Sequence, residues 1–91
     1  MNDAEFSKLI RDRDGWCLNC GRSSHLQAAH ILRRSYKLTR FDEDNAVTLC
    51  LWCHHYFTHH PLEWNEWVED RYPGRISDLR DRAGLIMDPH G

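Results

Sequence analysis

The chain has 91 residues, of which 41% are hydrophobic, and a formal net charge of −2. This length predicts one domain over residues 1–91, of a size that often needs a metal or a disulfide for stability. The longest apolar run, around residues 47–53, is much shorter than the roughly 18 residues of a membrane span, and the N-terminus lacks the features of a secretory signal. We therefore expect an intracellular, cytoplasmic protein with no membrane partner.

The first predicted element is a helix over residues 3–14. Asn2 or Asp3 can cap its first turn, its apolar residues share one face, and Gly15 ends it. Two short strands follow, over residues 26–32 and 46–49, and a polar loop joins them. The second strand is expected to lead into a helix that begins near the third cysteine.

The C-terminal part is predicted to be helical over residues 61–84. Pro61 suits the first turn of a helix and disfavours helical structure at the residue before it. Ser77 can cap a second, shorter helix, which Gly84 ends. The elements together predict an α+β domain, in which a core over residues 16–60 is flanked by helices on both sides.

The cysteines form two identical pairs, with two residues between the members of each pair. Two such pairs can supply the four thiolates of a closed, tetrahedral zinc site. Gly21, directly after the first pair, can adopt the left-handed conformation of a tight turn. Two disulfides or four buried free thiols are the alternatives, and disulfides require an oxidising compartment. We predict a structural zinc ion bound by Cys17, Cys20, Cys50 and Cys53.

Basic residues are concentrated in and around the polar loop. From Gly15 to Phe41 the chain has five bases and no acid, although the whole protein is slightly acidic. Because the local field governs attraction to a polyanion more than net charge does, this distribution, beside the cysteine pairs and several histidines, predicts contacts with backbone phosphates and little sequence readout. A solvated loop without a partner is the alternative. The residues predicted to contact phosphates are Arg33, Arg34, Lys37 and Arg40.

Several motifs in residues 16–60 together resemble the zinc-containing branch of the HNH endonucleases. His30 follows two alanines, Asn45 opens the segment Asn-Ala-Val-Thr-Leu, and His54 comes directly after the last cysteine. The run over residues 55–68 is similar to the end of small HNH proteins that phages and prophages carry. The resemblance implies a small, zinc-stabilised ββα-metal fold, treble-clef-like, with flanking helices.

The resemblance also implies that His30, Asn45 and His54 are the catalytic residues. His30 would activate the attacking water, because an imidazole with a pKa of about 6.5 is mostly neutral at cellular pH. Asn45 would hold the loop and orient the His30 ring through its amide, and it can close an Asx turn as well. His54 would bind a divalent cation that stabilises the scissile phosphate.

The second ligand of this cation is left open by the sequence. HNH proteins often have an acid or a histidine directly before the base histidine, and this chain has Ala29 there. His59 is the predicted supplement, with the pair of His55 and His59, or one of the acids Asp42 and Asp44, as alternatives. Because such a site offers imidazole nitrogen, Mn²⁺, Co²⁺ or Ni²⁺ should serve it better than Mg²⁺.

The sequence thus predicts a metal-dependent HNH DNA endonuclease or nicking enzyme that hydrolyses phosphodiester bonds. DNA is the expected partner, and the resemblance to phage proteins implies partner proteins of phage packaging or recombination. Two interpretations from other classes stand beside it. One is a catalytically silent zinc module that binds nucleic acid or protein, which Ala29 favours, and the other is a purely structural, treble-clef-like adaptor.

Overall fold

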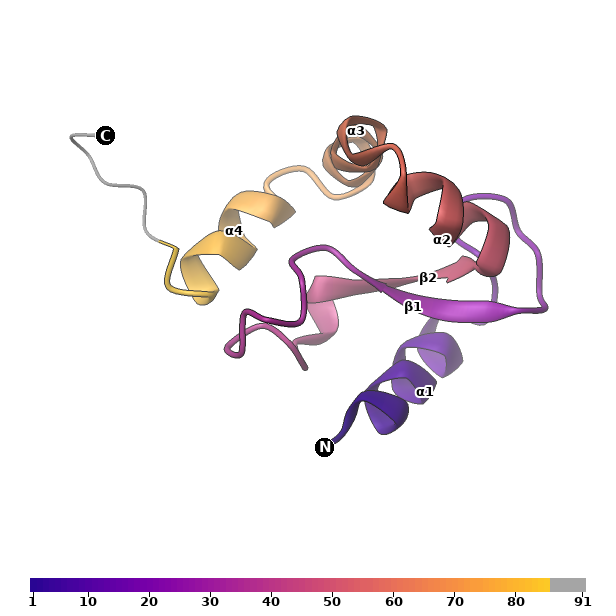
Figure 1. The fold of residues 1–91 in the computed structure, drawn as a ribbon, viewed down its shortest axis with the longest axis horizontal. Helices are drawn as coiled ribbons and strands as arrows, with labels where there is room; N and C mark the ends of the chain where they lie inside the picture. The colour runs from indigo at the N-terminus through magenta and orange to yellow at the C-terminus, as the bar shows by residue number, and fades with distance from the viewer. Residues whose placement is uncertain (86–91) are drawn as a thin grey trace.

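A computed structural model describes residues 1–85, which form three layers (Figure 1). Helix α1 covers one face of an antiparallel hairpin, and α2, followed by α3, covers the other face. None of the helices in this part of the chain combines the length and the apolar character needed to cross a membrane. The elements in order are α1 (Asp3–Asp14), β1 (Leu26–His30), the 3₁₀ helix η1 (Glu43–Asn45), β2 (Ala46–Cys50), α2 (Leu51–Thr58), α3 (Pro61–Arg71) and α4 (Arg75–Arg82).

Helix α1 begins and ends where its capping residues predict. The Oδ1 atom of Asn2 accepts a hydrogen bond from the N–H of Glu5 at 2.8 Å. Gly15, at a φ of 79°, ends the helix in the left-handed conformation that glycine adopts most easily. Phe6 and Ile10 are buried on the face that lies against the sheet.

The second strand, β2, lies at the centre of the molecule, and all five of its residues are buried. Its side chains alternate between the two faces of the hairpin. Ala46 belongs to the core under α1, whereas Val47 and Leu49 belong to the core that contains Phe57 of α2. Both cores are therefore filled from one short strand, which fixes the register that places His30 opposite Ala46.

Strand β1 is two residues shorter than predicted, and β2 is one residue longer. The side chain of Asn45 explains the early end of β1, since its Oδ1 accepts a hydrogen bond from the N–H of Leu32 at 2.7 Å. The Nδ2 of the same side chain donates to the carbonyl oxygen of Leu32 at 3.0 Å. Both backbone polar groups of Leu32 are thus used by a side chain, and the strand ladder cannot continue through it.

Helices α3 and α4 each bury one apolar residue completely, Val68 and Leu79 respectively. The prediction that Ser77 caps the last helix is wrong. Gly74, at a φ of 82°, turns the chain directly into α4, so that the helix begins at Arg75 and Ser77 lies inside it.

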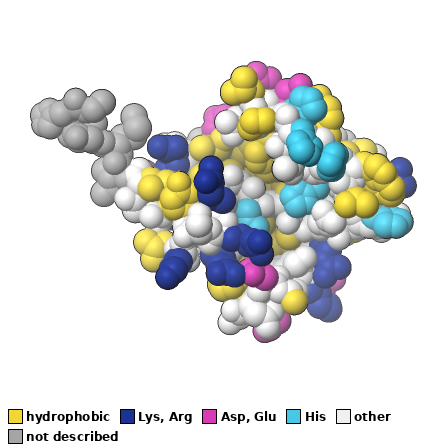
Figure 2. Space-filling view, in the orientation of Figure 1, with side chains coloured by type: hydrophobic (Ala, Val, Ile, Leu, Met, Phe, Trp, Pro, Cys, Tyr) yellow, Lys and Arg dark blue, Asp and Glu magenta, His cyan; other side chains and the backbone are white. Residues whose placement is uncertain are grey.

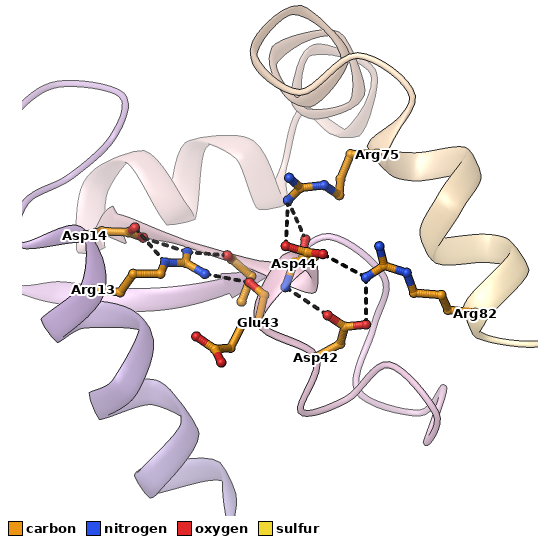
Figure 3. A network of polar contacts seen from close by, with 8 residues as sticks. Arg13, Asp14, Asp42, Glu43, Asp44, Arg75 and Arg82 are labelled. Atoms are coloured by element: carbon orange, nitrogen blue, oxygen red, sulfur yellow. Dashed lines mark hydrogen bonds and ion pairs between the residues drawn. The ribbon is translucent and has the colours of Figure 1, made fainter.

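A network of ion pairs and hydrogen bonds holds η1 between α1 and α4 (Figure 3). Nη1 of Arg82 lies 3.0 Å from Oδ2 of Asp42 and 2.9 Å from Oδ2 of Asp44. Nη1 of Arg75 donates to the carbonyl oxygen of Asp44 at 3.0 Å. From the other side, Arg13 of α1 donates to the carbonyl oxygen of Glu43 in η1 at 2.6 Å and to that of Ala46, the first residue of β2, at 2.8 Å. The residues that precede β2 are therefore fixed by both flanking helices.

Candidate active site and metal cluster

The four cysteines, all free thiols, form one cluster. Their sulfur atoms lie within 4.8 Å of one another, and the sulfurs of Cys20 and Cys50 are 3.7 Å apart. A tetrahedron with Zn–S bonds of about 2.3 Å has edges of about 3.8 Å, so this spacing is compatible with zinc. In each pair the N–H of the second cysteine donates to the sulfur of the first at 3.5 Å. The two predicted pairs thus meet as one tetrathiol site.

The pKa values of two thiols show why this cluster suits a cation. Burial acts to raise the pKa of Cys17, but hydrogen bonds from backbone N–H groups, that of Cys20 foremost, lower it to about 6. Burial raises the pKa of Cys53 to about 12, and the neighbouring thiols add to this effect. Four thiolates packed this closely repel one another, so a bound cation is needed to hold all four in the ionised form.

Two further side chains connect the cluster to α3. The Nδ2 of Asn19 donates to the sulfur of Cys53 at 3.3 Å, and its Oδ1 accepts a hydrogen bond from the indole N–H of Trp67 at 3.2 Å. The ring of Trp67 in turn lies 6.0 Å from that of Phe57, which belongs to α2. The tetrathiol cluster, α2 and α3 are therefore one connected unit.

His30 is the last residue of β1, and its protonated nitrogen is defined by a backbone oxygen. The Nε2 atom lies 3.0 Å from the carbonyl oxygen of Arg40, and because a carbonyl only accepts, Nε2 carries the hydrogen. The Nδ1 atom is then the basic nitrogen. Burial lowers the pKa of His30, against the effect of the Arg40 carbonyl, which raises it. A neutral imidazole with a free lone pair results at neutral pH.

His54 lies in the first turn of α2 and has the opposite protonation. Its Nδ1 atom lies 2.7 Å from Oε1 of Gln27, an acceptor, so Nδ1 carries the hydrogen and Nε2 has the lone pair. Burial lowers the pKa of His54, and the proximity of His30 lowers it further. A hydrogen bond on the far nitrogen of this kind is what orients a metal-binding histidine in many proteins.

His30 and His54 both line the same two hollows, of about 400 and 560 Å³, and Arg33 is the third residue that the hollows share. Figure 2 shows histidine side chains gathered over β1 and α2 on this face, with Lys and Arg side chains beside them over the β1–η1 loop and α4. Two neutral imidazoles and a guanidinium therefore border one open space, which is a suitable arrangement for contact with a phosphate.

Asn45 holds the loop, as predicted, but its amide bonds to the loop backbone rather than to His30. The side chain is fully buried, and besides its two bonds to Leu32 it donates to the carbonyl oxygen of Thr39 at 2.9 Å. Thr39 directly precedes Arg40, whose carbonyl oxygen accepts the bond from His30. Asn45 is thus connected to the His30 ring through the loop.

The four predicted DNA-binding residues differ in their surroundings. Arg33 lines both hollows, and Lys37 is exposed in the loop. Arg34 and Arg40 instead form ion pairs with Asp3 at the start of α1. All four lie on the same loop beside His30, although two of them already have an acidic partner.

The structure does not place the predicted supplements to His54 beside it. His59 is absent from the lining of both hollows, and its ring lies 4.5 Å from that of His55. Five residues correspond to about 500° of helical rotation, so His59 points about 140° away from His54 around α2. Asp42 and Asp44 are engaged with Arg75 and Arg82 (Figure 3). The second ligand remains a prediction.

Sequence reasoning missed two residues of the site, Gln27 and Asp3, which both line the larger hollow. The sequence could have pointed to Gln27. Side chains alternate along a strand, so Gln27 lies on the same face of β1 as the buried Ala29, which is the face that α2 covers. A polar residue under a helix needs a partner, and His54 is in reach. For Asp3 the sequence held no such signal, because its partners lie more than 30 positions away.

These features define a small α+β domain in which a tetrathiol cluster supports a β-hairpin and helix that carry two neutral histidines. The family model described as HNH endonuclease matches residues 17–62, just over half of the chain, and the chain belongs to this family. The matched segment contains all four cysteines together with His30, Asn45 and His54. Searches of curated proteins and of solved structures found no significant match.

Proposed function

We propose that this protein is a divalent-metal-dependent DNA endonuclease or nicking enzyme, and that His30 is its general base. One observation carries the proposal: His30 and His54 line the same hollows, and each has its hydrogen on the nitrogen that a protein oxygen engages. The basic nitrogens Nδ1 of His30 and Nε2 of His54 are then available for different tasks at one phosphate.

His30 would accept the proton of the attacking water at Nδ1. The Arg40 carbonyl holds the hydrogen on the other nitrogen and thereby fixes which atom is basic. Since burial lowers the pKa of this imidazole, the base form is present throughout the neutral range. Arg33, which lines both hollows, would contact the scissile or a neighbouring phosphate.

A divalent cation would be held by Nε2 of His54, with phosphate and water oxygens completing its coordination. The neutral, oriented imidazole fits this role, and when bound the ion supplies positive charge at the scissile phosphate and the leaving oxygen. Because the protein ligand in this proposal is an imidazole nitrogen, Mn²⁺, Co²⁺ or Ni²⁺ should serve better than Mg²⁺, while Zn²⁺ would occupy the tetrathiol cluster.

A plasmid-nicking assay tests the proposal, using the zinc-loaded protein with added Mn²⁺, Co²⁺, Ni²⁺ or Mg²⁺. His30→Ala should lower the cleavage rate at least about 100-fold, because the base is lost. The matched control is His25→Asn, at an exposed histidine packed against Trp52 whose positive φ of 55° asparagine tolerates. This control should cleave at the parent rate, and zinc content should be equal in all three proteins.

Undiminished nicking by His30→Ala would contradict the assignment of the base. DNA binding without cleavage in any metal would instead favour the silent binding module that Ala29 allows. His59→Ala decides the second ligand: a fall in activity that added Mn²⁺ restores would support His59, whereas unchanged metal dependence would exclude it.

A further inference from the structure

The carboxylate of Asp3 is held between two arginines of the β1–η1 loop. Its Oδ1 accepts a hydrogen bond from Nε of Arg40 at 3.1 Å, and its Oδ2 accepts from Nη2 of Arg40 at 2.5 Å. Nη1 of Arg34 lies 3.2 Å from the same Oδ2. Two parallel bonds to one guanidinium are the arrangement that arginine also makes with a phosphate.

This ion pair borders the proposed catalytic space. Asp3 lines the larger hollow together with His30, Arg34 and His54. The hydrogen bond with Arg40 is the main cause that lowers the pKa of Asp3, so the carboxylate is ionised at neutral pH. A negative group from α1 thus lies on a basic surface beside both histidines.

We propose that Arg34 and Arg40 form a phosphate-binding pair, that Asp3 occupies it in the free protein, and that a DNA backbone phosphate takes the place of Asp3 on binding. The inference rests on the proposed function, because it specifies how that site receives DNA. It adds an acidic residue of α1 as an internal competitor for the nucleic acid.

A phosphate can replace Asp3 at a small energetic cost, because the ion pairs of Asp3 with the two arginines lie at the surface. The side chains of Asp3, Arg34 and Arg40 are 37, 61 and 38% exposed, and ion pairs in such positions are weak. Asp3 is also the first residue of α1, where the helix dipole stabilises a carboxylate that has lost its partner. The carbonyl oxygen of Arg40 stays with His30 while the guanidinium changes partner, since Asn45 holds the loop from the residue before it.

The test compares Asp3→Asn with Glu5→Gln by fluorescence anisotropy of a labelled DNA duplex, using zinc-loaded protein without an added divalent ion. Both substitutions remove one negative charge from the first turn of α1, but Glu5 is exposed and has no ion pair within residues 1–85. Asp3→Asn should bind the duplex about two- to fivefold more tightly than Glu5→Gln, the factor by which a surface ion pair competes.

A second readout follows the guanidinium of Arg40 directly. The NMR signal of its Nε–H group should move when Asp3→Asn is made, and should also move when the parent protein is titrated with the duplex. Equal affinities of the two variants, or weaker binding by Asp3→Asn, would overturn the inference while leaving DNA binding intact. If the parent and Asp3→Asn both fail to bind, DNA binding itself fails, and the proposed function is lost with the inference.

Discussion

In each histidine of the site, the oxygen that accepts the ring's hydrogen bond determines which ring nitrogen carries the hydrogen. A backbone carbonyl holds the hydrogen of His30 on Nε2, and the side-chain oxygen of Gln27 holds that of His54 on Nδ1. The first contact depends on the course of the loop, whereas the second depends on one side chain. A substitution at Gln27 can therefore alter the proposed metal-binding nitrogen with little change to the fold.

Gln27→Leu should weaken divalent-ion binding at His54 by about 10- to 100-fold, the usual effect of losing the partner of a metal-binding histidine. Leucine has a similar volume but no acceptor, so the ring loses its orientation and its preferred protonation. The affinity can be measured with Mn²⁺ by electron paramagnetic resonance in the zinc-loaded protein, since Mn²⁺ binds thiolates poorly.

Two further variants serve as the negative and the positive control of that measurement. His54→Ala should abolish the Mn²⁺ signal of the site, and His25→Asn, at an exposed histidine outside both hollows, should leave it unchanged. A Gln27→Leu protein with the parent affinity would show that His54 needs no orienting partner.

At the scale of elements, the β1–η1 loop depends on Asn45. This one buried side chain closes the loop onto itself with three hydrogen bonds, two to Leu32 and one to Thr39. The loop carries the carbonyl that orients His30 and the predicted phosphate contacts. Its conformation is therefore part of the site, although it contains little regular structure.

Asn45→Ala should lower the free energy of unfolding by about 2–4 kcal/mol, because it leaves buried backbone groups without partners. It should also slow cleavage under conditions where the protein is still folded, since the Arg40 carbonyl is no longer held beside His30. Urea unfolding at saturating Zn²⁺ and the nicking assay measure the two effects.

Thr48→Val separates loop geometry from stability. The Thr48 hydroxyl donates to the carbonyl oxygen of Ile10 at 3.1 Å, away from the loop, so its loss costs about 1–2 kcal/mol without touching His30. This variant should cleave normally when folded. Normal cleavage by folded Asn45→Ala would instead mean that the loop orients itself without the amide.

At the scale of the whole molecule, the tetrathiol cluster joins segments that are distant in sequence. It connects the turn after α1 to the start of α2, and Asn19 and Trp67 extend the connection to α3. A chain of this length buries a small core, and structural zinc in small domains contributes roughly 10–16 kcal/mol of apparent binding energy. We infer that folding depends on the metal.

Cys20→Ser should release the ion and abolish cooperative unfolding, whereas Asn19→Ala should keep it and lose only about 1 kcal/mol with its hydrogen bonds. Metal analysis of the purified variants and thermal melts followed by circular dichroism distinguish the two results. A Cys20→Ser protein that retains one zinc per chain and a sharp melt would contradict a four-thiolate site.

The local signals in the sequence were sufficient for the four α-helices, the two strands and the family, but they predicted neither η1 nor the start of α4. Asn2 and Gly15 cap α1 through neighbours in the chain, and the spacing of the cysteine pairs predicted a cluster that the structure assembles. Such signals work because caps, turns and thiol pairs act over a few residues. The predicted end of β1 was wrong because the backbone of Leu32 is hydrogen-bonded by a side chain 13 positions away.

Only the tertiary structure decided which side chains serve the two histidines and the arginines. It placed Gln27 against His54, turned His59 to another side of α2, and brought Asp3 onto Arg34 and Arg40. These contacts join positions 27 to 37 residues apart, or depend on the rotation of a helix. A linear pattern specifies which residue types are present, but the packing of α1 and α2 on the two faces of one hairpin determines which of them meet.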